Sequence, residues 1–270
     1  SRRSAPSEDI MGNDYTRTIS TAQECETTAR LLLKIALLGS LIIASAYMLT
    51  PFTAKAAVAR LDHVGLPFAS SVANAGLIAH RYSQVRAAME QGDFELASLP
   101  LTLLAEQGHS EAQYLLGIAH GTGLGVTHDM RESVRWYKRA AVNGHRDAQY
   151  NLGVAYSMGT GIAIDAAKAV SWWHKAAVQD STDAQFNLGL MYAQGEGVNK
   201  DMLEASKWWL KAALRGDAAA QYALGLMYVR GDGVAQDLNQ ALKWWYLSAS
   251  QGFERAQSAL RKLGLIVTTQ

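Results

Sequence analysis

The sequence predicts an all-α solenoid, in which helical hairpins follow one another along the chain. The main observation is a six-residue motif, Ala-Gln-Tyr-Leu-Leu-Gly and close variants, that recurs every 36 residues and starts at Ala112, Ala148, Ala184 and Ala220. A weaker copy starts at Ala256. A Gly-x-Gly pair, first at Gly123, and a pair of large aromatic residues, first at Trp136, keep the same interval. Internal repeats of about 20–50 residues are typical of solenoids and arrays.

The first half of each unit predicts an amphipathic helix. Ala148, Leu152 and Tyr156 are spaced i, i+4 and i+8, so they share one helical face. Gly153 on the same helix has no side chain and allows a neighbouring helix to approach closely. The Gly-x-Gly pair that starts at Gly159 then ends the helix and permits positive φ.

The second half of each unit predicts another helix. Asp165 is a suitable N-cap because its carboxylate can accept hydrogen bonds from free backbone N–H groups. Ala169, Trp172 and Ala176 form an apolar stripe, and Trp173 points about 100° away from Trp172. One aromatic can therefore fill its own hairpin while the other fills the joint to the next unit. Since one hairpin cannot bury both stripes alone, the units must stack.

This repeated pattern resembles the Sel1-like repeat family, whose members are relatives of the tetratricopeptide repeats. The resemblance rests on Ala-x-x-x-Leu-Gly-x-x-Tyr, the Gly-x-Gly-Val turn and Asp-x-x-x-Ala-x-x-Trp-x-x-x-Ala-Ala, and it covers residues 111–252. Single positions depart from the pattern at His120, Asp180 and Arg261. The resemblance implies a right-handed solenoid and a non-catalytic role, because Sel1-like proteins typically mediate assembly of protein complexes, often membrane-bound ones.

Composition supports a well-packed protein without a nucleic-acid footprint. The chain is 49% hydrophobic and 18% charged, and its formal net charge is +1. We find no cluster of Lys and Arg that would dominate one face, so no nucleic-acid partner is expected. Cys25 is the only cysteine, which excludes an intrachain disulfide.

An apolar block near the N-terminus predicts one transmembrane helix at residues 31–50. Its 19 residues from Leu31 to Leu49 would span roughly 28 Å as a helix, close to the hydrocarbon core of a bilayer. We favour an uncleaved anchor. The alternatives are a signal peptide cleaved near the small residues Ala54 and Ala56, and a buried core helix.

Flanking charges give the expected orientation of this anchor. Arg17, Arg30 and Lys34 lie before or at the start of the block, whereas Lys55 and Arg60 follow it. The positive-inside rule then places the N-terminus inside and the repeats outside. The favoured location is a bacterial inner membrane with periplasmic repeats, and a mitochondrial or endoplasmic-reticulum membrane is the alternative.

These features divide the chain into six segments. They are a polar, disordered tail at 1–30, the transmembrane helix at 31–50, a linker or membrane-surface segment at 51–80, a degenerate capping hairpin at 81–108, four repeats at 109–252, and a C-terminal capping helix and tail at 253–270. The segment 51–80 is open to two interpretations, a linker at the membrane surface or a docking segment for a membrane partner. The capping hairpin is expected to combine a helix from Arg81 to Gln91 with one from Phe94 to Glu106.

The sequence gives no support for catalysis, a cofactor or a metal. The glycine-rich run that begins at Gly121 superficially resembles a phosphate loop, but no strand precedes it and no Gly-Lys-Ser/Thr follows. The seven histidines show no i, i+4 pair and no His-Glu-x-x-His motif. There is no Gly-x-Ser-x-Gly elbow. We therefore predict no enzyme activity and no small-molecule substrate.

One row of residues is a candidate protein-binding surface. If the first helices line a concave face, as the tetratricopeptide resemblance implies, the inner positions carry Tyr114, Tyr150, Phe186 and Tyr222, followed one turn later by Val154, Leu190 and Leu226. Such a row could anchor an extended peptide or a helix. The alternative is that the aromatics only pack neighbouring first helices together.

The predicted function is a membrane-anchored scaffold or adaptor for proteins, in particular for assembly of a membrane complex. The alternative is an accessory subunit that docks through the transmembrane helix and the 51–80 segment.

Overall fold

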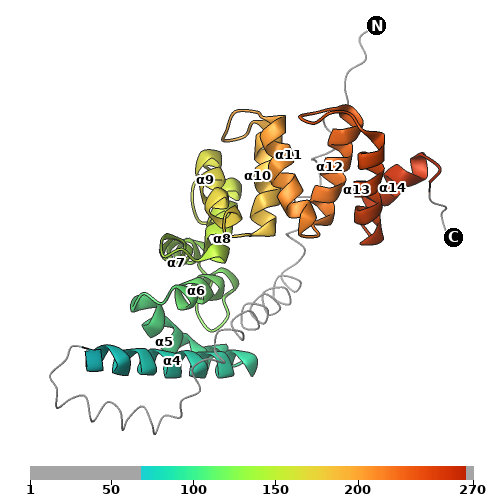
Figure 1. Cartoon of the computed structure of the whole chain (residues 1–270). Coiled ribbons are helices and arrows are strands. Elements are labelled where there is room, and N and C mark those ends of the chain that lie inside the picture. Colours follow the sequence, from blue (N-terminus) through green and yellow to red (C-terminus); the bar gives the residue numbers. More distant parts are fainter. Residues whose placement is uncertain (1–67, 266–270) are drawn as a thin grey trace. The chain divides into compact units, whose positions relative to one another are not determined.

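The computed structural model describes residues 68–265, which form eleven α-helices and no strand (Figure 1). The helices are α4 (Phe68–Glu90), α5 (Phe94–Glu106), α6 (Ser110–Thr122), α7 (Met130–Val142), α8 (Arg146–Met158), α9 (Ala166–Ala177), α10 (Thr182–Gln194), α11 (Met202–Leu214), α12 (Ala218–Arg230), α13 (Leu238–Ser250) and α14 (Glu254–Lys262). The predicted tail at 1–30 and transmembrane helix at 31–50 lie outside the described residues. Within 68–265, no helix combines the length and apolarity that crossing a bilayer requires.

The chain divides into two compact units. The described part of the first contains residues 68–107 and 118–129, and the second contains 108–117 and 130–265. In the first unit α4 packs against α5. Helix α4 starts at Phe68, not at the predicted Arg81, so the end of the segment assigned to a linker is helical. The prediction relied on where charged residues begin, but the small apolar residues before them also tolerate a helix.

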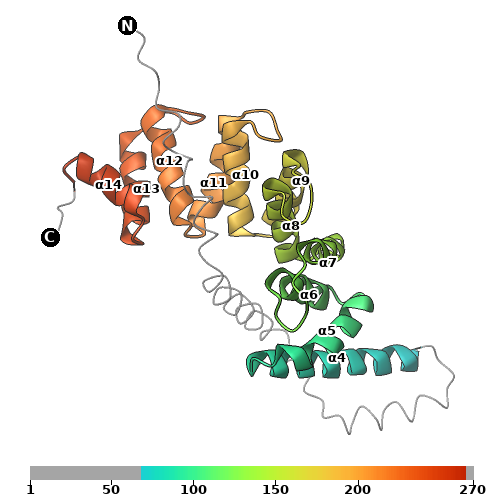
Figure 2. The same cartoon turned by 180° about the vertical axis from the view of Figure 1, so that it is seen from behind.

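Helical hairpins build the second unit, as the sequence predicts (Figure 2). Helices α8 and α9 pair with each other, as do α10 with α11 and α12 with α13. Each second helix also packs on the first helix of the next hairpin, and α13 packs on the single last helix α14. The fold is thus an all-α solenoid of helix-turn-helix repeats.

Inside each hairpin, the second aromatic of the pair covers the helical glycine. A Cβ atom at Gly153 would lie 2.5 Å from the Trp173 ring, so only glycine fits there. The Trp173 indole N–H also donates to the Tyr150 carbonyl at 3.2 Å. Trp209 and Trp245 repeat both contacts in the next two hairpins. This confirms that one aromatic of each pair fills its own hairpin.

The joints between hairpins use the other aromatic and a buried glutamine. Trp208 on α11 meets the edge of His174 on α9, with ring centroids 5.4 Å apart. Gln149 donates to the Ala141 carbonyl of the preceding hairpin at 3.0 Å. Its own amide oxygen accepts from Gln179 at 2.8 Å. The glutamine therefore ties the end of one hairpin to the start of the next.

One joint departs from this scheme, at Gln185. This side chain is 1% exposed, and its oxygen has no hydrogen-bond partner in the described chain. Arg215 stands where the other repeats supply an amide, and it pairs with Asp180 at 2.5 Å instead. Among residues 68–265, Asp180 is also the one non-glycine residue with positive φ, at 67°.

We expect the double variant Asp180→Gly with Arg215→Gln to be more stable than the natural chain. Glycine removes a left-handed strain of roughly 1–2 kcal/mol, and glutamine supplies a donor to Gln185 worth about 1 kcal/mol. The lost ion pair is solvent-exposed and contributes little. Guanidinium unfolding should show a net gain of about 1–2 kcal/mol. A loss of stability would contradict this account of the joint.

Candidate protein-binding face

The predicted binding row lies on the first helices of the second unit, at one equivalent position in each. Tyr150, Phe186 and Tyr222 are half-buried, and so are Val154, Leu190 and Leu226 one turn later. Tyr114 is different because it is only 6% exposed. The binding role of the row stays a prediction, but the structure brings the three half-buried aromatics to successive helices α8, α10 and α12.

Part of each aromatic ring is used for packing. Tyr114 stacks on His145 at 4.4 Å between ring centroids. Tyr222 stacks on Trp245 at 6.2 Å and tilts against Phe253 at 5.6 Å. Phe186 packs against the apolar cluster of the α10–α13 region. The alternative of packing between neighbouring helices therefore holds for one side of these rings, while the half-buried members keep another side accessible.

Two histidines cap the first helices at the start of the second unit. The Nδ1 atom of His145 accepts from the Ala148 N–H at 3.2 Å, and Nε2 lies 2.8 Å from a Glu111 carboxylate oxygen. Nδ1 can accept only when it carries no proton, so Nε2–H donates to Glu111. His109 caps α6 through Ala112 in the same way, and burial lowers its pKa. At this end of the row, the His145 ring stacks on Tyr114 and covers it.

Acidic groups border the row where the first helices begin. Asp147 is paired with Arg146 at 2.8 Å. The pKa of Asp183 is raised, first by desolvation and then by the charge of Asp147. Desolvation also raises the pKa of Asp217, to which the charge of Asp183 adds. These carboxylates from successive repeats are therefore close enough to influence one another.

Sequence reasoning missed one polar member of the face. The half-buried Asn187 lies between Phe186 and Leu190 along α10, and its amide makes no hydrogen bond with the part of the chain that the structure describes. An amide offers both donors and an acceptor to a peptide backbone. The signal was available, because Asn151 occupies the same position one repeat earlier.

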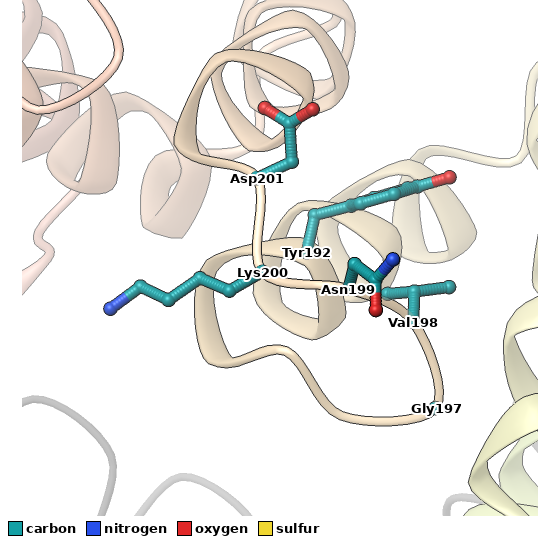
Figure 3. A pocket seen from close by; sticks show the side chains of 6 residues that line it. All are labelled: Tyr192, Gly197, Val198, Asn199, Lys200 and Asp201. Carbon is teal, nitrogen blue, oxygen red and sulfur yellow. The ribbon is translucent and has the colours of Figure 1, made fainter.

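A surface pocket lies beside the turn between α10 and α11, lined by Tyr192, Gly197, Val198, Asn199, Lys200 and Asp201 (Figure 3). The Lys200 and Asp201 side chains extend in different directions, so they do not converge on one ligand. Asp201 is also occupied as an N-cap, since it accepts from the Glu204 N–H at 2.9 Å. This turn is structural. In residues 68–265, no three His, Cys, Asp or Glu side chains gather in a metal-binding group.

Known structures with the same repeat resemble this chain. A Sel1 repeat protein from Oxalobacter formigenes is 34% identical, with a TM-score of 0.62 over 66% of this chain and 70% of its own. The protective antigen c5321 of uropathogenic Escherichia coli, which has an SLR fold, is 33% identical, with a TM-score of 0.63 over 72% of this chain. This chain spans only 45% of the length of c5321.

No curated protein matches the chain. The family model of the Sel1 repeat matches four consecutive segments, residues 110–145, 146–181, 182–217 and 218–253. Together these segments make up more than half of the sequence, and they coincide with the four hairpins of the 36-residue pattern. The chain therefore belongs to the Sel1 repeat family.

Proposed function

We propose that this chain is a non-catalytic adaptor that holds a protein segment against its first helices. Sel1 repeat proteins are generally protein-interaction scaffolds. The observation that carries the proposal is the row of half-buried aromatics, Tyr150, Phe186 and Tyr222, presented at the same position of the first helix in three successive repeats. Aromatic side chains that are rigid and partly exposed are favoured anchors in protein interfaces.

The chemistry of the row suits a segment of polypeptide. Leu190 follows Phe186 by one helical turn, so each repeat offers an apolar contact of two side chains. Asn187 adds an amide beside them that makes no hydrogen bond with the described residues and can bond to a backbone. Since the apolar contacts recur with the repeat, an extended strand or a helix can cross several units and use the same contact more than once.

Membrane attachment is a further part of the proposal and rests on the sequence alone. Residues 31–50 would anchor the chain, and the adaptor would assemble a membrane complex. The favoured location is the periplasmic side of a bacterial inner membrane. In the alternative, an accessory subunit would dock mainly through 31–50 and 51–80. Removing residues 1–56 separates the two, because only the adaptor retains its partner.

Photo-crosslinking tests the binding face directly. A photoreactive phenylalanine at Leu190 should crosslink a protein partner in native cells, because this side chain lies in the proposed row. The matched control is Val178, an exposed aliphatic residue that caps the C-terminus of the second helix α9. Equal crosslinking from both positions, or a product from Val178 alone, would reject the row as the binding face.

Charged substitutions give the quantitative version of the test. We expect Val154→Lys, Leu190→Lys and Leu226→Lys together to abolish capture of the crosslinked partner, because three ammonium groups would oppose apolar contact. The same change at Val142, Val178 and Leu214 should leave capture within about twofold, since Val142 and Leu214 end second helices and Val178 directly follows one. Affinity purification in mild detergent measures both, and circular dichroism checks that helicity is retained.

A further inference from the structure

We propose that the second helices of the repeats form a lipid-binding surface for anionic membrane headgroups. We call it the basic–apolar face and define it by three pairs, Arg139 with Val142, Lys175 with Val178, and Lys211 with Leu214. The spacing within each pair is the same in the first three repeats: two pairs lie on α7 and α11, and in the remaining pair Lys175 lies on α9 and Val178 is the C-cap residue that follows it. This surface lies on other helices than the protein-binding row, so it extends the proposed function and does not depend on it.

Charged residues are distributed unequally between the first and second helices of the four repeats. The four first helices α6, α8, α10 and α12 contain two arginines and three acidic residues. The second helices α7, α9, α11 and α13 contain only two acidic residues, Glu132 and Glu204. They carry nine basic residues, Arg131, Arg135, Lys138, Arg139, Lys168, Lys175, Lys207, Lys211 and Lys243. The net charge of +1 does not reveal this separation, because it averages over both sets of helices.

The C-terminal ends of the same helices expose aliphatic side chains, two on the last helical residue and one on the C-cap residue. Val142, Val178 and Leu214 are 68%, 61% and 72% exposed. Along the first helices α6, α8, α10 and α12 no large apolar side chain reaches a comparable exposure. Apolar and basic groups therefore gather on one set of helices, which is the composition of surfaces that lie in a membrane interface.

Tryptophan rings position the three cations of the basic–apolar face. The Lys175 ammonium lies 3.8 Å above the centre of the Trp172 ring, and the Lys211 ammonium lies 3.9 Å above Trp208. The Arg139 guanidinium is 4.4 Å above Trp136. Cation–π contacts of this kind hold a charge in place while leaving its N–H donors free for an acceptor. The two acidic residues of these helices are already paired, Glu132 with Arg135 and Glu204 with Lys207.

Anionic lipid fits this surface better than an acidic protein. Charge complementarity requires a negatively charged occupant. Protein interfaces concentrate their energy in a central, well-packed cluster, whereas Val142, Val178 and Leu214 come from three different repeats and are each largely exposed. A fluid interface accepts separate aliphatic groups without a complementary pocket, and phosphates accept hydrogen bonds from ammonium and guanidinium groups. The proposed anchor at 31–50 would further raise the local concentration of this face near a bilayer.

An environment-sensitive fluorophore on the full chain tests the proposal. In a Cys25→Ser background, the dye is attached through Val178→Cys or, as the control, through Asp183→Cys on the first helix α10. The chain is mixed with phosphatidylcholine vesicles that contain or lack phosphatidylglycerol. We expect the dye at residue 178 to shift to the blue only with phosphatidylglycerol, and to revert in 0.5 M salt. The dye at residue 183 should not respond.

Charge neutralisation supplies the second measurement. Arg139→Gln, Lys175→Gln and Lys211→Gln together should raise the lipid concentration for half-maximal shift on the order of 100-fold, at roughly fivefold per cation. The matched control neutralises three arginines outside the face, Arg146→Gln, Arg215→Gln and Arg230→Gln, and should change it less than about tenfold. Circular dichroism confirms that both variants are folded. The apolar block at 31–49 is present in every sample, so it cannot produce these differences.

Several results would overturn the proposal. One is an equal shift with and without phosphatidylglycerol, and another is a shift at residue 183 as large as that at residue 178. If the two neutralised variants have equal effects, vesicle binding depends on the net charge of the chain and not on the basic–apolar face. A shift at residue 178 with polyglutamate but not with vesicles would assign the face to an acidic protein. None of these results affects capture through the first helices, so the two proposals fail independently.

Discussion

Trp173→Ala is expected to lower the free energy of unfolding by about 3–5 kcal/mol, the range for removing a large aromatic side chain from a core. Trp173 is 2% exposed and fills its own hairpin. Its ring covers Gly153, and its indole N–H bonds to the Tyr150 carbonyl. Alanine would leave a cavity that the two helices cannot close without moving together along their whole length.

The neighbouring tryptophan is the control for this prediction. Trp172 is half-buried and carries the Lys175 ammonium on its ring, so Trp172→Ala removes less buried surface from the same helix. We expect a loss below about 2 kcal/mol. Guanidinium unfolding monitored by circular dichroism measures both variants. Equal losses would mean that the two aromatics share one role, against the division between hairpin and joint.

Sequence periodicity predicted the repeat architecture because the constraints on packing recur with it. The ring of Trp173 packs against a helix position that has no side chain, and Gly153 provides this position at a fixed distance along the chain. The N-cap aspartates were equally predictable, since Asp165 accepts from the Lys168 N–H at 2.9 Å as expected. A feature that is repeated four times within one chain gives a strong signal for the fold.

Features that break the period were harder to predict. The start of α4 at Phe68 was missed because small apolar residues mark neither a helix nor a linker. The substitution at Asp180 was visible, but its compensation by Arg215, 35 residues later, depends on how two hairpins meet. A residue that departs from the repeat is therefore recognisable in the sequence, whereas the residue that it contacts is known only from the structure.

For the candidate site, the positions of the residues were predictable from the sequence, but their accessibility was not. It placed Tyr114 in the binding row by spacing, yet His145 from the following hairpin covers that ring. Nor did a net charge of +1 show that basic residues gather on the second helices. Spacing along one chain predicts which residues are equivalent, but contacts with neighbouring repeats determine which of them are exposed to solvent.

The second large effect is expected for Gly161→Ala, in the turn between α8 and α9. Gly161 has φ of 71°, and a Cβ atom there would lie 2.2 Å from the Met130 carbonyl oxygen at the start of α7. The obstacle is backbone, which cannot rotate away as a side chain can. We expect a loss of roughly 2–5 kcal/mol, the sum of left-handed strain and overpacking.

Gly144→Ala separates the two contributions. Gly144 has φ of 85°, but a Cβ atom there would meet nothing within 4 Å, so alanine at this position introduces only the conformational strain of roughly 1–2 kcal/mol. The difference between the two variants in guanidinium unfolding measures how closely the turn approaches the preceding hairpin. If both lose the same free energy, the turn can move away from α7 at little cost, and the glycine pair serves only to end the first helix. A larger loss for Gly161→Ala means that the second glycine of each turn is required for neighbouring hairpins to stack.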